Sequence, residues 1–168
     1  MNVLERIGQV KHLFFDIDGV LTDGSVTVFN DGSQIRKFNI KDGWAISRCV
    51  KLGYNFVVIS AGRDDSVIKR LQYLGVKEIN IGVTDKLDFF QKYLNQNGWE
   101  LSNCLYMGDD MADYLVMKQK EVLSVCPQDA ADDIVSISDY VCSKNGGYGA
   151  AREILEKLLK IQDKWISL

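Results

Sequence analysis

The chain has 168 residues, of which 46% are hydrophobic and 26% are charged, and it contains a single proline. This composition is typical of one globular domain with a sizeable core and excludes a disordered or low-complexity protein. The formal net charge of −3 argues against electrostatic binding to nucleic acid or to an anionic membrane, and no apolar run approaches the roughly 20 residues of a membrane-spanning helix.

The expected elements alternate between strands and helices along the chain. The expected strands cover residues 10–16, 25–29, 34–38, 56–60, 78–82, 104–107, 122–125 and 140–141. The expected helices cover residues 42–52, with Asp42 as the cap, and then 64–74, 85–97, 111–118 and 149–161. Such alternation through short loops predicts an α/β fold in which a doubly wound parallel sheet forms the middle of three layers.

The strands at 25–29 and 34–38 flank Asn30, Asp31 and Gly32 and predict a β-hairpin inserted into the first strand-to-helix connection. We expect one domain over residues 1–168, with this hairpin at about 25–38 and a closing tail helix at about 149–161. No insertion is long enough to form a covering domain, so the hairpin stands where a cap domain could otherwise lie.

The four cysteines are scattered and form no C-x-x-C pair, which predicts reduced, buried thiols and disfavours a zinc site. The first twelve residues lack the long apolar core and the cleavage signature of a signal peptide. We therefore expect a cytoplasmic location.

The apolar run 13–15 leads into two carboxylates, Asp16 and Asp18, before the chain turns at Gly19. Residues two apart in a strand share a face, so the two carboxylates should lie close together. Two like charges at that separation need a cation or a shared proton. The pair suits a nucleophile next to a group that moves a proton, although a strand end with an Asx turn remains an alternative.

Other polar residues follow the later strands, and parallel strands would bring them to the same edge of the sheet as Asp16 and Asp18. Asp109 could share Mg²⁺ with Asp16, because this ion prefers carboxylate oxygens. Lys86 could stabilise charge in a transition state. These parts together predict phosphoryl transfer through an aspartyl-phosphate.

A phosphate group would need further donors, and Ser60 with the backbone N–H groups of Ala61 and Gly62 could supply them. Simpler roles also exist for several of these residues. Ser60, Asp109 and Asp110 could each cap a helix, and most lysines in a first helical turn, such as Lys86, are solvated.

Four motifs in this order resemble those of the haloacid dehalogenase superfamily: DIDGVLTDG at 16–24, ISAGRD at 59–64, Lys86, and GDDMAD at 108–113. The resemblance implies that Asp16 is the nucleophile and Asp18 the general acid and base. It also implies Mg²⁺ held by Asp16, by the carbonyl group of Asp18 and by Asp109. Asp110 and Asp113 would support the metal ligands from outside.

Three longer stretches are similar to the 3-deoxy-D-manno-octulosonate 8-phosphate phosphatases: IRKFNIKDGWAI at 35–46, GDDMADYLVM at 108–117 and NGGYGAARE at 145–153. Members of this subfamily act on a sugar-acid phosphate in the synthesis of the inner sugar of lipopolysaccharide. They carry a hairpin in place of a lid and form homotetramers whose neighbouring subunits wall the site. The stretch 146–149 then resembles a mobile tail segment that carries Arg152 towards a site.

The substrate's own carboxylate calls for a cation, and Arg63 and Arg152 are the candidates, because arginine matches a carboxylate geometrically. Either could instead form a surface ion pair, Arg63 with Asp64 or Asp65 and Arg152 with Glu156. The chain departs from the subfamily pattern at Ala61, where glycine is common, and at Asp64, which adds negative charge next to the anion site.

Apolar residues on the hairpin exceed what a small exposed hairpin needs, which favours a contact between subunits; they are Val26, Val28, Ile35 and Phe38.

Two alternatives to an eight-carbon sugar phosphatase stay open. One is a phosphatase for nine-carbon, sialic-acid-type 9-phosphates. The other is a non-catalytic module, either a receiver-like domain or a domain that assists a sugar-nucleotide synthetase. The intact set of Asp16, Asp18, Ser60, Lys86 and Asp109 argues against a module that has lost catalysis.

Overall fold

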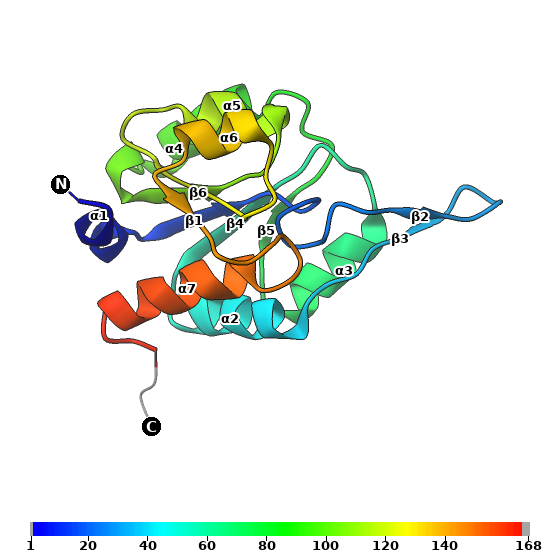
Figure 1. The fold of residues 1–168 in the computed structure, drawn as a ribbon, viewed down its shortest axis with the longest axis horizontal. Helices are drawn as coiled ribbons and strands as arrows, with labels where there is room; N and C mark the ends of the chain where they lie inside the picture. Colours follow the sequence, from blue (N-terminus) through cyan, green and yellow to red (C-terminus); the bar gives the residue numbers. More distant parts are fainter. Residues whose placement is uncertain (1, 166–168) are drawn as a thin grey trace.

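The computed structural model describes residues 2–165, which form three layers with a six-stranded sheet in the middle (Figure 1). The strand order is β5-β4-β1-β6-β7-β8, and every neighbouring pair is parallel. The strands of this sheet are β1 (His12–Phe15), β4 (Asn55–Ile59), β5 (Glu78–Asn80), β6 (Cys104–Met107), β7 (Leu123–Cys126) and β8 (Tyr140–Val141). The expected doubly wound α/β architecture is confirmed.

Helices cover both faces of the sheet, α4, α5 and α6 on one face and α1, α2, α3 and α7 on the other (Figure 1). None of the helices in the described part of the chain has the length and apolar character that crossing a lipid bilayer requires. The helices are α1 (Val3–Gln9), α2 (Ile40–Lys51), α3 (Asp65–Tyr73), α4 (Lys86–Asn97), α5 (Met111–Met117), α6 (Asp132–Ile137) and α7 (Ala150–Ile161), with a 3₁₀ turn at Leu101–Asn103.

Strand β1 lies in the centre of the sheet, and its side chains alternate between the two cores. Leu13 and Phe15 pack in the core under α2 and α7, whereas Phe14 packs in the core under α4. All three side chains are fully buried. Each contributes about 1.5–3 kcal/mol of burial free energy, so the position of the residue that follows β1 is firmly fixed.

The structure differs from the expectation at two helices and one cap. The short helix α1 begins at a capping box formed by Asn2 and Glu5, a signal that the sequence carried, and α6 was also not expected. Helix α2 begins at Ile40 because Asn39, not Asp42, caps it. Asp42 lies buried inside the first turn and accepts a hydrogen bond from the backbone N–H of Arg152, at 2.7 Å.

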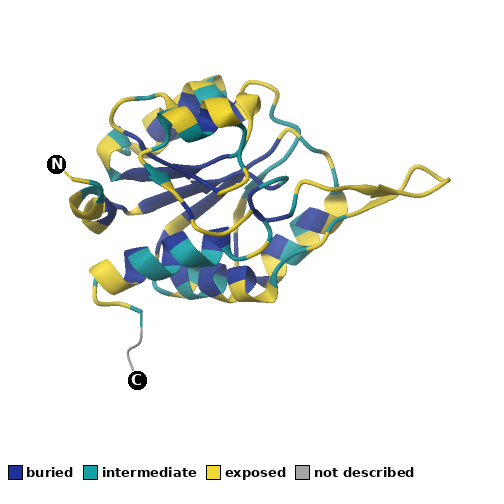
Figure 2. Cartoon of the chain, viewed as in Figure 1, coloured by how far each residue is buried: buried dark blue, intermediate teal, exposed yellow. Residues whose placement is uncertain are grey.

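The hairpin forms an arm that extends from the body of the molecule, built from β2 (Thr27–Val28) and β3 (Gln34–Ile35) (Figure 1). Its strands are shorter than expected, because the pairing is confined to two residues on each side. The arm is exposed along its whole length, in contrast to the sheet (Figure 2). Phe38, at its base, packs instead against the core of its own chain.

Candidate active site

Asp16 is the first residue after β1 and lies at the carboxyl end of the sheet. The residue as a whole is 8% exposed. One oxygen, Oδ1, accepts a hydrogen bond from the backbone N–H of Ile17 at 2.7 Å, and Oδ2 lies 2.7 Å from the Nζ atom of Lys86. The strand end therefore presents a buried carboxylate next to a fixed cation.

Lys86 is the first residue of α4 and is buried, in contrast to the solvated alternative. Its ammonium group lies 2.7 Å from both Asp16 and Asp113. Asp113 is completely buried and also accepts a hydrogen bond from the hydroxyl group of Tyr106 at 2.7 Å. Tyr106 could not be singled out from the sequence, since a tyrosine in a buried strand is an ordinary core residue.

Asp109 follows β6 and comes close to the loop after β1. Carboxylate oxygens of Asp16, Asp109 and Asp113 all lie within 4.8 Å of one another. Gly19 makes this approach possible, because a Cβ atom on it would overlap the carboxylate of Asp109. Gly19 also has a φ of +82°, which favours glycine. Asp113 accepts a hydrogen bond from the backbone N–H of Asp109 at 3.3 Å.

Burial and mutual repulsion raise the pKa values of the clustered carboxylates. Burial is the largest cause for Asp16, followed by the charge of Asp113, and together they outweigh Lys86 and raise the pKa to about 7. Burial also dominates for Asp109, followed by the charges of Asp16 and Asp113, and raises its pKa to about 8. One lysine therefore does not neutralise the cluster, which is what a site for a further cation requires.

The donor set fits a hard divalent cation such as Mg²⁺, since it consists of carboxylate oxygens and contains neither thiolate nor imidazole. Asp109 has no ion-pair partner among the described residues, and Asp16 has one, Lys86. Asp113 is already engaged by Lys86 and Tyr106.

Asp18 lies apart from this cluster and is held by the arm. Its Oδ1 atom accepts a hydrogen bond from Nε of Arg36 at 2.7 Å and lies 3.4 Å from the Thr22 hydroxyl group. Arg36 also contacts Asp64, with 2.7 Å between Nη1 and Oδ2. Hydrogen bonds from Ser66 lower the pKa of Asp64, and the Arg36 guanidinium adds to this effect. The extra negative charge noted in the sequence is thus paired.

Ser60 follows β4 and is buried, with its hydroxyl oxygen 3.2 Å from the backbone N–H of Gly62. A Cβ atom on Gly62 would stand 3.5 Å from both Ser60 Oγ and Asp18 Oδ2. Ser60 is not a helix cap, since Asp64 caps α3. The structure therefore brings Ser60 and Gly62 together with Asp18, while Ala61 is exposed beside them.

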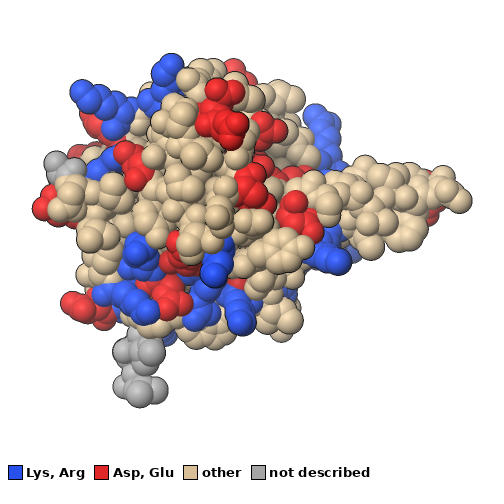
Figure 3. All heavy atoms as spheres, viewed as in Figure 1, with Lys and Arg blue, Asp and Glu red and all other residues tan. Residues whose placement is uncertain are grey.

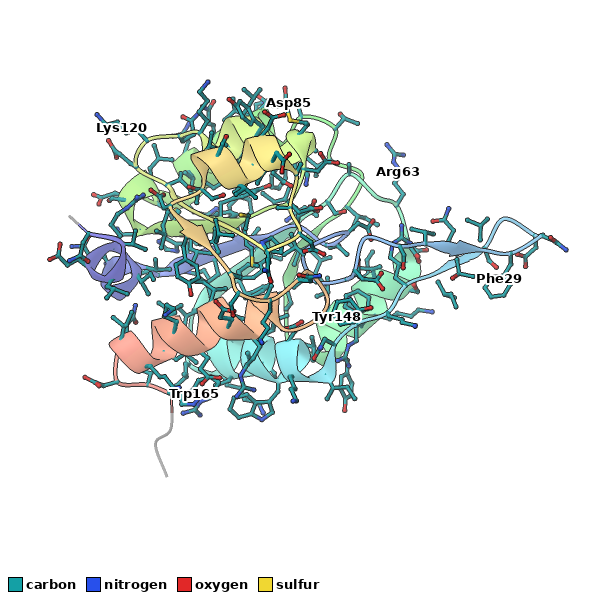
Figure 4. All side chains as sticks on the ribbon, in the orientation of Figure 1. Phe29, Arg63, Asp85, Lys120, Tyr148 and Trp165 are labelled. Atoms are coloured by element: carbon teal, nitrogen blue, oxygen red, sulfur yellow. The ribbon has the colours of Figure 1, made fainter. Side chains whose placement is uncertain are left out.

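Two expected site residues lie at the edge of this region. Arg63 is exposed and covers Gly82, and it points away from the body of the molecule at the end that carries the arm (Figure 4). Neither Asp64 nor Asp65 forms an ion pair with it. Asp110 is exposed and caps α5 through the backbone N–H of Met111, so the capping alternative is correct for this residue.

Residues 146–149 pack against the loop after β1 through their backbone. The N–H group of Gly147 donates to the carbonyl oxygen of Val20 at 3.1 Å. A Cβ atom on Gly146 would overlap the carbonyl oxygen of Gly19. Tyr148 lies next to this loop, at the same end of the molecule as the arm (Figure 4). The segment therefore holds the loop that carries Asp18 in place.

Arg152 does not join this site within its own chain. It pairs with Glu156 at 2.8 Å, which is the surface alternative, and its guanidinium stacks on Trp44 and Trp165. These contacts place it on the face of α7 that meets α2, where Figure 4 shows Trp165, the last residue that the structure describes. Its expected role in substrate binding stays a prediction.

Known proteins resemble this chain over nearly its whole length. A family model described as haloacid dehalogenase-like hydrolase matches residues 72–154. The 3-deoxy-D-manno-octulosonate 8-phosphate phosphatase of Escherichia coli K12 is 35% identical over 164 residues, which cover 97% of this chain and 86% of that protein.

Solved structures show the same relationship. The Yersinia pestis 3-deoxy-D-manno-octulosonate 8-phosphate phosphatase has a TM-score of 0.93 at 31% identity, covering 97% of this chain and 88% of that one. The Moraxella catarrhalis enzyme, crystallised with magnesium ion, phosphate ion and KDO, has a TM-score of 0.92 at 28% identity, covering 97% and 93%. This chain therefore belongs to the 3-deoxy-D-manno-octulosonate 8-phosphate phosphatase family of haloacid dehalogenase-like hydrolases.

Proposed function

We propose that this protein is a Mg²⁺-dependent phosphatase that hydrolyses 3-deoxy-D-manno-octulosonate 8-phosphate to the free sugar acid and inorganic phosphate. The observation that carries the proposal is the buried Asp16 carboxylate, in contact with Lys86 and beside Asp109. The E. coli relative, 35% identical over 97% of the chain, supports this substrate. The reaction would serve lipopolysaccharide inner-core sugar synthesis, by resemblance to the family.

In the first step, an Asp16 oxygen attacks phosphorus and the bond from phosphorus to the sugar oxygen breaks. Asp18 gives a proton to the departing oxygen, so the sugar leaves as an alcohol. In the second step, water attacks the aspartyl-phosphate, returns a proton to Asp18 and releases inorganic phosphate. Mg²⁺, held by Asp16, Asp109 and the Asp18 carbonyl group, would supply neutralisation of the phosphate charge.

The remaining site residues have supporting roles in this proposal. Lys86 stabilises charge that develops on the phosphoryl oxygens. The Ser60 hydroxyl group and the backbone N–H groups of Ala61 and Gly62 donate to the phosphate. Asp113 holds Lys86 and Asp109, and Asp110 shapes the same turn by capping α5. Arg63 binds the substrate carboxylate, because it is exposed at this end of the molecule.

We further propose a homotetramer in which neighbouring protomers wall the open site. The exposed apolar side chains of the arm support this assembly, and Figure 3 shows a mostly uncharged arm surface. Arg152 then contributes to a neighbouring protomer's site. Residues 1–168 would act as one phosphatase domain. A cytoplasmic location agrees with the four free, buried cysteines.

The test is a phosphate-release assay with the purified protein, with Mg²⁺ and with excess chelator. We expect release from 3-deoxy-D-manno-octulosonate 8-phosphate that stops when the metal is removed. A nine-carbon, sialic-acid-type 9-phosphate serves as the matched substrate, and preference for it would assign the other sugar. No release from any member of a panel of sugar phosphates would assign the chain to the non-catalytic class.

A further inference from the structure

Arg36 is the first residue after β3, and it enters the site from the base of the arm. Its side chain is only 8% exposed, although the arm residues before it are exposed. Two of its nitrogen atoms are committed, Nε to Asp18 and Nη1 to Asp64, each at 2.7 Å. A buried arginine that spans two carboxylates is held in one orientation, because its planar fork fixes both partners.

We propose that Arg36 is a positioning residue that orients the Asp18 carboxylate for proton transfer, and that Asp64 holds Arg36 in place. The proposal rests on the proposed function, since it assigns Asp18 the proton that the leaving sugar oxygen receives.

The two carboxylate oxygens of Asp18 have different neighbours. Oδ1 is occupied by Arg36 Nε and lies near the Thr22 hydroxyl group. Oδ2 has no hydrogen-bond partner among the described residues and faces Gly62, 3.5 Å from where a Cβ atom of Gly62 would stand. Ser60 Oγ lies at the same distance from that point. Arg36 therefore holds Oδ1, and Oδ2 faces Ser60 and Gly62, the residues proposed to bind the phosphate.

Asp64 completes this arrangement from the opposite side. It caps α3 through the backbone N–H of Ser66, so its own position is fixed by a helix start. Its Oδ2 atom holds Arg36 Nη1, which leaves the guanidinium little freedom to turn. The pair also explains how this chain tolerates an aspartate next to an anion site, since Arg36 balances its charge.

The closing experiment exploits the leaving group. A sugar alkoxide is a poor leaving group and needs the proton from Asp18, whereas nitrophenolate leaves readily without one. The variants Arg36→Gln, Arg36→Lys and Asp64→Asn are compared with the native protein on 3-deoxy-D-manno-octulosonate 8-phosphate and on p-nitrophenyl phosphate, with kcat and KM determined separately. Lys37→Gln, at the exposed neighbouring position, is the matched control.

We expect Arg36→Gln to lower kcat/KM for the sugar phosphate by about 10–100-fold through kcat, and for p-nitrophenyl phosphate by less than about 3-fold. Arg36→Lys should recover part of the loss, and Asp64→Asn should lose about 2–5-fold on the sugar phosphate alone. Lys37→Gln should match the native protein on both substrates.

Three results would overturn the proposal. Native kcat in Arg36→Gln would show that Asp18 needs no such support. An equal loss on both esters, with a lowered Tm, would make the role structural, and a rise in KM alone would make it substrate binding. A native protein that releases no phosphate from either ester would instead refute the proposed function itself, and the role of Arg36 with it.

Discussion

The carboxyl edge of the sheet buries charged side chains, whereas the arm exposes apolar ones. At the edge, Asp16, Lys86 and Asp113 are buried charges, and each finds its partner within the same chain. On the arm, Val28 and Ile35 are more than half exposed, at 62% and 54%, and nothing in the described part of the chain covers them. The acidic cluster is therefore built within one protomer, whereas the proposed walls of the site would come from neighbouring protomers.

Figure 2 shows the difference in burial between the two regions, and this difference decides how each should respond to substitution. Buried charges tolerate little change, because removing one partner leaves the other without compensation. Exposed apolar residues on the arm can be altered with little cost to the protomer that carries them. Substitutions should therefore affect chemistry and folding at the edge, and assembly at the arm.

The largest effect is expected at Asp16, the proposed nucleophile. Asp16→Asn should lower kcat by at least about 10⁴-fold, because an amide cannot form the aspartyl-phosphate. Its circular dichroism spectrum should match that of the native protein. Asp132→Asn, at an exposed carboxylate of α6, is the control and should keep full activity. Phosphate release by Asp16→Asn at the native rate would show that another group attacks phosphorus.

Lys86→Met should affect both catalysis and folding. We expect kcat to fall by about 10²–10³-fold and the free energy of unfolding to fall by about 3–5 kcal/mol, because Asp16 and Asp113 lose their shared cation. Urea denaturation with and without Mg²⁺ measures the second effect, and Mg²⁺ should restore part of it. Unchanged stability in this variant would contradict the view that Lys86 compensates the buried charges of Asp16 and Asp113.

Substitutions on the arm should affect the assembly of protomers rather than the folding of each protomer. The double variant Val28→Glu with Ile35→Glu should dissociate the tetramer in sedimentation experiments and lower kcat/KM by about 10-fold, while the unfolding free energy of the protomer changes by less than about 0.5 kcal/mol per site. Tyr73→Glu, at an apolar residue that is 83% exposed away from the arm, is the matched control. A native protein that sediments as a monomer would remove the proposed walls.

The smallest effect concerns pH. In the metal-free protein, the pKa values of Asp16 and Asp109 lie near 7 and 8, above the value of about 4 in an unfolded chain. The folded state then holds more protons than the unfolded state between about pH 4 and 8, so stability falls as pH rises through this range.

Mg²⁺ binds the ionised carboxylates and should oppose this loss. The increase in Tm that Mg²⁺ produces should be larger at pH 8 than at pH 6, by about 2–4 °C. Differential scanning calorimetry at both pH values measures it. In Asp109→Asn, the increase in Tm that Mg²⁺ produces should differ less between pH 6 and pH 8. If Mg²⁺ raised the Tm of the native protein equally at both pH values, this would argue against a raised pKa at the cluster.

The sequence predicted the sheet well, because its strands are continuous apolar runs followed by polar residues. Strand β6 and strand β8 match their expected bounds, and β1 delivers Asp16 as expected. The cap of α2 was misplaced by three residues, since Asn39 and Asp42 are both good caps and only tertiary packing against α7 separates them.

Partners across the chain were harder to predict. Lys86 was singled out only by its place among the motifs, whereas its burial between two carboxylates depends on how α4 meets the sheet. Arg36 was missed altogether, because in a hairpin an arginine is ordinarily a solvated residue. Its role became visible only once the arm was seen to bring it to Asp18 and Asp64.

The backbone contact between Gly147 and Val20 joins the last quarter of the chain to the loop that carries Asp18. Synthesis on the ribosome delivers that loop first and its support more than a hundred residues later. A nascent or truncated chain that ends before this glycine thus contains the proposed nucleophile but lacks the backbone contact that supports the loop after it. Such a chain should stay inert towards phosphate esters in the cell until Gly147 has been synthesised.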